Sequence, residues 1–212
     1  SSPPIVGGVE SVVAHHARQI TKAGHQVTIL AGRGQTFDER IPVRLLPFLD
    51  SRHEDVLRIK TQLDKGIKPQ EFDNLREKIK KELLVDLKDT DVLIAHNIAS
   101  LHKNLPLTGA LHDAYKIAGF PHLILWHHDL AWTTPRYRHE MHAGYPWDLL
   151  RDRWEGSTHV VISEVRRQEY MDLTGISRDC IHVIPNGVDV PTFFKLEQQT
   201  IQLIDRYKLI ES

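Results

Sequence analysis

Residues 121–129 read PHLILWHHD, in which an unbroken apolar run from Leu123 to Trp126 is followed directly by polar residues. The stretches VLIAHN at 92–97 and THVVIS at 158–163 have the same form. Continuous apolar strands are typical of a parallel sheet, because helices cover both faces of such a sheet. The three stretches therefore predict strands of one buried parallel sheet.

The segments between and after these strands predict helices. Residues 104–119 and 163–175 each end in glycine, the usual residue after a helix C-terminus, and residues 146–157 open on a proline, which suits a first turn. Residues 180–189, CIHVIPNGVD, predict a last strand and a turn. This alternation of strand and helix predicts an α/β fold with a doubly wound, mostly parallel, Rossmann-like sheet.

The chain opens SSPPIVGGVESVVAHHARQI, so a glycine pair, Gly7 and Gly8, leads into a segment with helical apolar spacing. Glu10 falls in the predicted first turn, where the helix dipole favours negative charge, and Gly24 marks the end of the helix. Residues 25–32, HQVTILAG, predict the next strand. The backbone N–H groups of such a glycine pair suit a phosphate or another anion, and a plain tight turn is the alternative.

The middle of the chain is charged and helical in period from residue 54 to residue 87, with a break at Pro69. Residues 73–87, DNLREKIKKELLVDL, place apolar side chains at four-residue spacing and basic residues on the other faces. We expect a solvated amphipathic helix here. Peripheral contact with an anionic membrane is the alternative.

Composition excludes several classes of protein. The 27 Lys and Arg residues nearly balance the 28 Asp and Glu residues, so no overall charge favours a nucleic-acid partner. The single cysteine, Cys180, excludes an internal disulfide framework and fits a reducing compartment, so we expect a cytoplasmic location. The chain has 14 histidines but neither an HExxH motif nor a Cys/His framework, so we expect no metal site.

Polar residues end each predicted strand, and ligands of doubly wound folds lie outside the carboxyl ends of the strands. We therefore expect one edge of the sheet, together with the Gly7–Gly8 turn, to carry His96, Asn97, His128, Asp129, Ser163, Glu164, Asn186 and Gly187. Each has a purely structural alternative, because Ser163 is a natural helix N-cap and Asn97 and Asn186 are turn formers.

The ordered set of PPIVGGVE, VLIAHN, HHDL, SEVRRQEYMDLTG and VIPNGVD resembles the N-terminal domain of the retaining GT-B glycosyltransferases of family 4. The resemblance runs from Pro3 to about Phe194 and implies an enzyme that transfers a sugar from a nucleoside diphosphate sugar without a metal or another cofactor. Residues 1–190 would form the acceptor-side domain, and the family's first strand, which precedes the glycine loop, would be missing. Residues 191–212 would be an interdomain linker and helix leading to a donor-binding domain. We expect little transfer by these 212 residues alone, because that domain holds most of the donor.

The resemblance also implies roles for individual residues. His128 would be the active-site histidine that hydrogen bonds to the donor sugar, although a one-residue slip in strand register would put His127 in its place. Arg166 and Arg167 could meet an anionic group on the acceptor, with solvated surface arginines as the alternative. The other residues expected to contact substrate, or to shape the loops around it, are Gly7, Gly8, Asp129, His96, Asn97, Ser163 and Asn186.

The family binds its acceptor mainly through loops at the strand ends, so we expect a carbohydrate or lipid-linked acceptor near residues 126–147. This loop contains four aromatic residues on which a sugar could stack: Trp132, Tyr137, Tyr145 and Trp147. The alternative is that the rings only pack the loop onto the domain.

Two rival functions share this fold class. An NAD(P)-dependent oxidoreductase needs a G-x-G-x-x-G turn and an acidic residue at the end of the second strand, whereas this chain has GGVES and Ala31-Gly32-Arg33-Gly34. A non-catalytic module that binds a glycan or a protein is the second rival. The Glu-x7-Glu pattern of the family's following domain would distinguish it from an enzyme.

Overall fold

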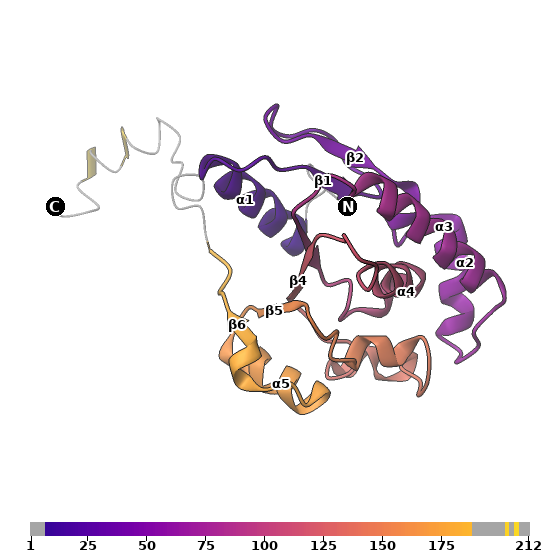
Figure 1. The fold of residues 1–212 in the computed structure, drawn as a ribbon. Coiled ribbons are helices and arrows are strands. Elements are labelled where there is room, and N and C mark those ends of the chain that lie inside the picture. The colour runs from indigo at the N-terminus through magenta and orange to yellow at the C-terminus, as the bar shows by residue number, and fades with distance from the viewer. Residues whose placement is uncertain (1–6, 188–201, 204–205, 208–212) are drawn as a thin grey trace.

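The computed structural model describes residues 7–187, 202–203 and 206–207. The strand expected before the glycine pair lies outside these residues, and so does almost all of the linker and helix expected at 191–212. The described part contains two parallel sheets with helices packed around them (Figure 1).

The larger sheet confirms the predicted parallel arrangement. Its four strands lie in chain order, β3-β4-β5-β6, and all pairs are parallel. The strands are β3 (Val92–His96), β4 (His122–His127), β5 (Thr158–Val161) and β6 (Ile181–Val183). In the register, His96 is the partner of Trp126, and His127 is the partner of Val161. The carboxyl ends of neighbouring strands therefore meet at one edge of the sheet.

The N-terminal strands form a sheet of their own. β1 (Ile29–Ala31) pairs in parallel with β2 (Val43–Leu45), and within the described ranges these two strands share no ladder with the larger sheet. Sequence had predicted one sheet, whereas the described strands make two. The fold class is confirmed, because every described strand pair is parallel and α-helices connect β2 to β3, β3 to β4 and β5 to β6.

Helices lie against both faces of the larger sheet (Figure 1). The helices are α1 (Gly8–Lys22), α2 (Glu54–Leu63), α3 (Glu71–Asp86), α4 (Leu105–Ala114) and α5 (Glu164–Thr174). On one face, Leu125 packs in a core with α2, α3 and α4, and Val161 packs against Tyr170 of α5. On the opposite face, His16 of α1 contacts Trp126. This is the doubly wound arrangement.

The amphipathic helix α3 faces the core. Its apolar residues Leu75, Ile79 and Leu83 are buried in the largest cluster, so this face is not available to a membrane. Burying three leucine-sized side chains stabilises the fold by roughly 1.5–3 kcal/mol each. The solvated-helix interpretation is therefore supported over peripheral membrane contact through this face. Across the part of the chain that the structure describes, every helix is too short or too polar to span a bilayer.

Two predicted helices are shorter than expected. The helix predicted over 104–119 ends at Ala114, before Gly119. The segment 146–157 forms only a 3-10 helix, Trp147–Arg151. The physical cause is Trp154, which is buried at φ +45 with its indole N–H donating to the carbonyl of Leu149, so the chain turns back instead of continuing as a helix.

Candidate functional site

Asn97 joins the carboxyl ends of β3 and β4. Its side-chain Oδ1 accepts the backbone N–H of His128 at 2.8 Å and that of Asp129 at 3.3 Å. Its own N–H donates to the carbonyl of Trp126 at 2.8 Å. The backbone of Asn97 is left-handed, with φ +58, a conformation that asparagine tolerates better than most residues. The side chain of Asn97, directly after β3, therefore holds the loop after β4.

His96 and His128 are in direct contact at this edge. Nδ1 of His96 lies 3.0 Å from Nε2 of His128, and the two rings are stacked. Burial lowers the pKa of His96 to about 3, with smaller contributions from His128 and His16. Burial likewise lowers the pKa of His128, against an opposing effect of Asp129. Both imidazoles are therefore neutral near pH 7, and one donates its N–H to the other.

His127 points to the other face of the sheet, as the alternation of side chains along a strand requires. It is 1% exposed and stacks on Tyr170, and its Nε2 lies 3.3 Å from Nδ1 of His159. Burial holds the pKa of His127 well below its ordinary value. Of the two adjacent histidines, the structure thus brings His128, and not His127, to His96 and the strand-end edge.

His16 is a further member of this cluster that sequence reasoning missed. Its ring lies 4.4 Å from that of Trp126 and 5.5 Å from that of His96, measured between centroids. Burial lowers the pKa of His16, and among the described residues its buried Nδ1 has no hydrogen-bond partner, nor has the buried Nε1 of Trp126. The helical spacing could have predicted this position. His16 falls three and four residues from Val13 and Val12, on the inward face of the predicted helix.

The glycine pair begins the same helix. Gly7 is the N-cap of α1, and Gly8 is its exposed first residue, with open space where a side chain would stand. Gly8 and His16 are eight residues apart, which corresponds to about 12 Å along the helix axis. The carboxylate of Glu10 lies beside Gly7, so a negative group of the chain itself already approaches this N-terminus.

The residues of the β5–α5 connection that were expected to contact substrate make structural contacts within the protein instead. Ser163 is the N-cap of α5 and accepts the N–H of Arg166 at 3.1 Å. Arg166 pairs with Glu169 at 2.5 Å, and Arg167 pairs with Glu164. Asn186 is exposed after β6. Neither arginine is an unpaired cation, which weakens the idea that they await an anionic acceptor.

A pocket of about 560 Å³ opens at Asp129, the residue that follows His128. We call it the β4–α5 pocket, because it lies between the loop after β4 and the first turns of α5. Two of its residues, Asp129 and Arg166, are among the site residues expected from sequence. The full lining is Asp129, Thr133, Thr134, Pro135, Arg136, Arg166 and Glu169.

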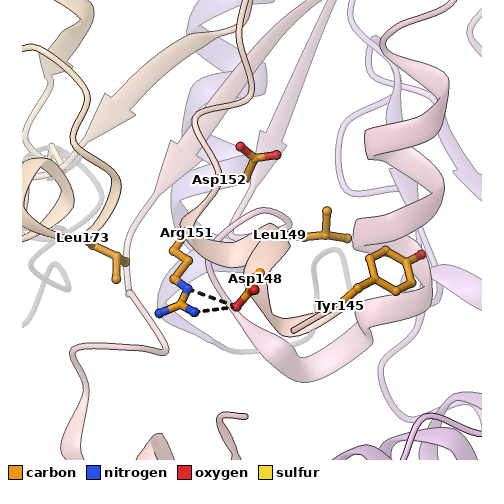
Figure 2. A pocket seen from close by; sticks show the side chains of 6 residues that line it. All are labelled: Tyr145, Asp148, Leu149, Arg151, Asp152 and Leu173. Atoms are coloured by element: carbon orange, nitrogen blue, oxygen red, sulfur yellow. Dashed lines mark hydrogen bonds and ion pairs between the residues drawn. The ribbon is translucent and has the colours of Figure 1, made fainter. Parts of the chain in front are cut away.

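A second pocket, of about 500 Å³, lies toward the other end of α5 (Figure 2). Its lining includes Leu173, near the C-terminus of that helix, and Tyr145. Arg151 turns toward Asp148 and pairs with it at 2.7 Å (Figure 2). Because its charges are satisfied and it is remote from the strand-end edge, this pocket is a weaker candidate for the site.

The aromatic loop is mostly packed against the domain. Trp147 is buried, and its carbonyl accepts the indole N–H of Trp132 at 3.2 Å. Tyr137 packs edge-on against His102. Tyr145 is the most exposed of the four rings, at 42%, but its hydroxyl accepts a hydrogen bond from Arg76. The structure thus supports the packing role of these rings.

Asp64, His102 and Glu140 form a group whose ligand atoms lie within 4.8 Å of one another, close enough to hold a metal ion. The ammonium of Lys60 stands between the two carboxylates, 2.5 Å from Asp64 and 3.1 Å from Glu140. The pKa of Glu140 falls to about 2, because hydrogen bonds from Lys60 and His102 outweigh the opposing effect of burial. A metal would have to displace this ammonium, so the arrangement is that of an ion-pair network.

Comparison with known proteins assigns the chain to a family. No curated protein matches the chain. Residues 6–191, however, match Glycosyltransferase Family 4, which covers most of the 212 residues and nearly all of the described structure. The chain therefore belongs to glycosyltransferase family 4.

Proposed function

We propose that this chain is the acceptor-side domain of a retaining glycosyltransferase, and that a nucleoside diphosphate sugar is its donor. Membership of the family supports sugar transfer in general. The observation that supports substrate binding by this domain is the edge of the sheet at the carboxyl ends of its strands. There, Asn97 holds the backbone of His128 and Asp129 beside a pocket. Polar groups converging at the carboxyl ends of parallel strands are the usual setting for a ligand in this fold.

The proposed reaction sets two tasks. As the bond from the sugar to the diphosphate breaks, negative charge grows on the leaving group and positive charge grows on the sugar. The acceptor hydroxyl must also be held close to the reacting carbon. We assign the diphosphate to the N-terminus of α1, where Gly8 leaves open space above backbone N–H groups. The acceptor lies on the side of Asp129.

His128 acts as a neutral hydrogen-bonding group in this proposal. Its pKa is lowered, mainly by burial, so little of it is protonated near neutral pH and it serves there neither as a cation nor as a general acid. When His96 donates Nδ1–H to Nε2 of His128, the remaining proton of His128 sits on Nδ1. Nδ1 of His128 has no hydrogen-bond partner within residues 7–187, so it is available to a sugar hydroxyl. In that arrangement, His96 holds His128 in the tautomer that presents Nδ1–H.

The test is sugar transfer by the full-length protein, with this domain and the following one present, over a panel of nucleoside diphosphate sugars. We expect turnover or donor hydrolysis with at least one donor, and a loss of activity in His128→Ala. Absence of both reactions with every donor, in a protein shown to be folded, would contradict the proposal.

A further inference from the structure

The β4–α5 pocket contains two charged groups that are not neutralised. The carboxylate of Asp129 and the guanidinium of Arg136 have no ion pair in the part of the chain that the structure describes. Arg136 only lies over the ring of Tyr137, at 4.5 Å. The other two charges of the pocket, Arg166 and Glu169, satisfy each other. The lining therefore offers one free hydrogen-bond acceptor group and one free donor group without a net charge.

The threonines add hydroxyl groups in fixed orientations. The hydroxyl of Thr134 donates to the carbonyl of Leu130 at 2.7 Å, so its oxygen can still accept a hydrogen bond. Thr133 lies 3.4 Å from the carboxylate of Glu169. Pro135 supplies the rest of the loop wall. Four of the seven lining residues are charged, and an acyl chain would take them out of water without offering a hydrogen bond, so the pocket does not suit an acyl chain.

The charge balance also argues against a phosphate. An anion entering the pocket would meet the carboxylates of Asp129 and Glu169, and Arg166 is already engaged by Glu169. A polyol meets no such conflict, because each hydroxyl can donate to a carboxylate and accept from a guanidinium. The volume of about 560 Å³ lies within the usual range for a small-molecule site.

We propose that the β4–α5 pocket binds the acceptor, and that this acceptor presents a neutral saccharide unit whose hydroxyls donate to Asp129 and accept from Arg136. The assignment as acceptor rests on the proposed function, whereas the preference for a neutral saccharide rests on the pocket alone. Asp129 directly follows His128, and Asn97 holds both backbones. A saccharide bound to Asp129 therefore lies beside the group that faces the donor.

The test is saturation-transfer NMR on the 212-residue chain with the methyl glycosides of glucose, galactose, mannose and N-acetylglucosamine. Inorganic phosphate and a short-chain fatty acid are the competing probes. The variants are Asp129→Asn and Arg136→Gln, which remove one charged hydrogen-bonding group each. Asp172→Asn is the matched control, because Asp172 lies on α5 outside the pocket lining and is exposed. Thermal melts check that all variants are folded.

We expect at least one glycoside to bind saturably, with affinity lowered roughly tenfold or more in Asp129→Asn and Arg136→Gln and unchanged in Asp172→Asn. Failure of every glycoside to bind, binding that survives both substitutions, or displacement of the glycoside by phosphate or fatty acid at this pocket would overturn the inference. The outcomes separate from those of the proposed function. Glycoside binding without any sugar transfer would support the assignment of the pocket and contradict the proposed enzyme activity. Sugar transfer without glycoside binding would support the enzyme activity and contradict the assignment of the pocket.

Discussion

Nδ1 of His96 and Nε2 of His128 lie 3.0 Å apart, so the ends of two neighbouring strands are joined by a contact between two imidazoles. His16 of α1 packs beside them on Trp126. Because burial lowers the pKa of all three histidines, this cluster of imidazoles is polar without being charged. Such an edge suits hydrogen bonding to sugar hydroxyls.

Asn97 should be the residue on which the shape of this edge depends most. Asn97→Ala loses the acceptor for two N–H groups and places alanine at φ +58, so we expect the free energy of unfolding to fall by about 2–4 kcal/mol. Urea denaturation measures the change. Asn97→Gly is the matched control, because glycine accepts this backbone but not the hydrogen bonds, and it should lose about 1–3 kcal/mol. A glycine variant as stable as the parent would show that the side-chain acceptor is unimportant.

Stability should fall in mild acid. Burial lowers the folded-state pKa of His96 to about 3 and lowers those of His127 and His159, whereas unfolded histidine titrates near pH 6.5. The unfolded chain thus binds more protons than the folded one below about pH 6.5, so stability is complete above that pH and decreases beneath it. His96 alone should account for a loss of about 2 kcal/mol by about pH 5.

Urea midpoints measured across this pH range test the acid effect. His96→Gln should make the pH dependence of stability shallower, while His139→Gln, at a side chain that is 78% exposed, should leave it unchanged. Equal stability at neutral and mildly acidic pH would contradict the burial of neutral histidines.

Gly32, directly after β1, should not tolerate a side chain. A Cβ there would lie 2.0 Å from the backbone nitrogen of Asp50, so Gly32→Ala must move backbone and should cost about 1–3 kcal/mol in stability. Gly8→Ala is the control, because nothing lies within 4 Å of its Cβ and alanine favours helix, so stability should be unchanged or raised by up to about 1 kcal/mol. Equal melting temperatures for the two variants would refute this difference.

The strands and the helix caps could be predicted from sequence because their signals are local. The apolar run before His127 predicted β4, and the serine at 163 predicted the N-cap that the structure shows. Alternation along the strand also separated His127 from His128, given the choice of register.

The rest of the site depends on tertiary contacts that no local pattern contains. The segment 146–157 has a helical pattern, but the burial of Trp154 at φ +45 turns it back. The β4–α5 pocket is formed by an irregular loop and by α5, so its lining follows from packing and not from spacing. His16 lies beside His96 only because α1 packs across the end of the sheet.

Comparison of His128→Ala with His127→Ala in the full-length protein is the most direct test of the proposed site. We predict that His128→Ala lowers the rate of sugar transfer by about 100-fold or more, because a group oriented toward the reacting sugar is lost, while the protein remains folded at the assay temperature. His127→Ala should instead lower stability, because it removes the ring that stacks on Tyr170, and should retain transfer below its melting temperature. Full transfer activity in His128→Ala, with the loss confined to His127→Ala, would contradict the assignment of the site.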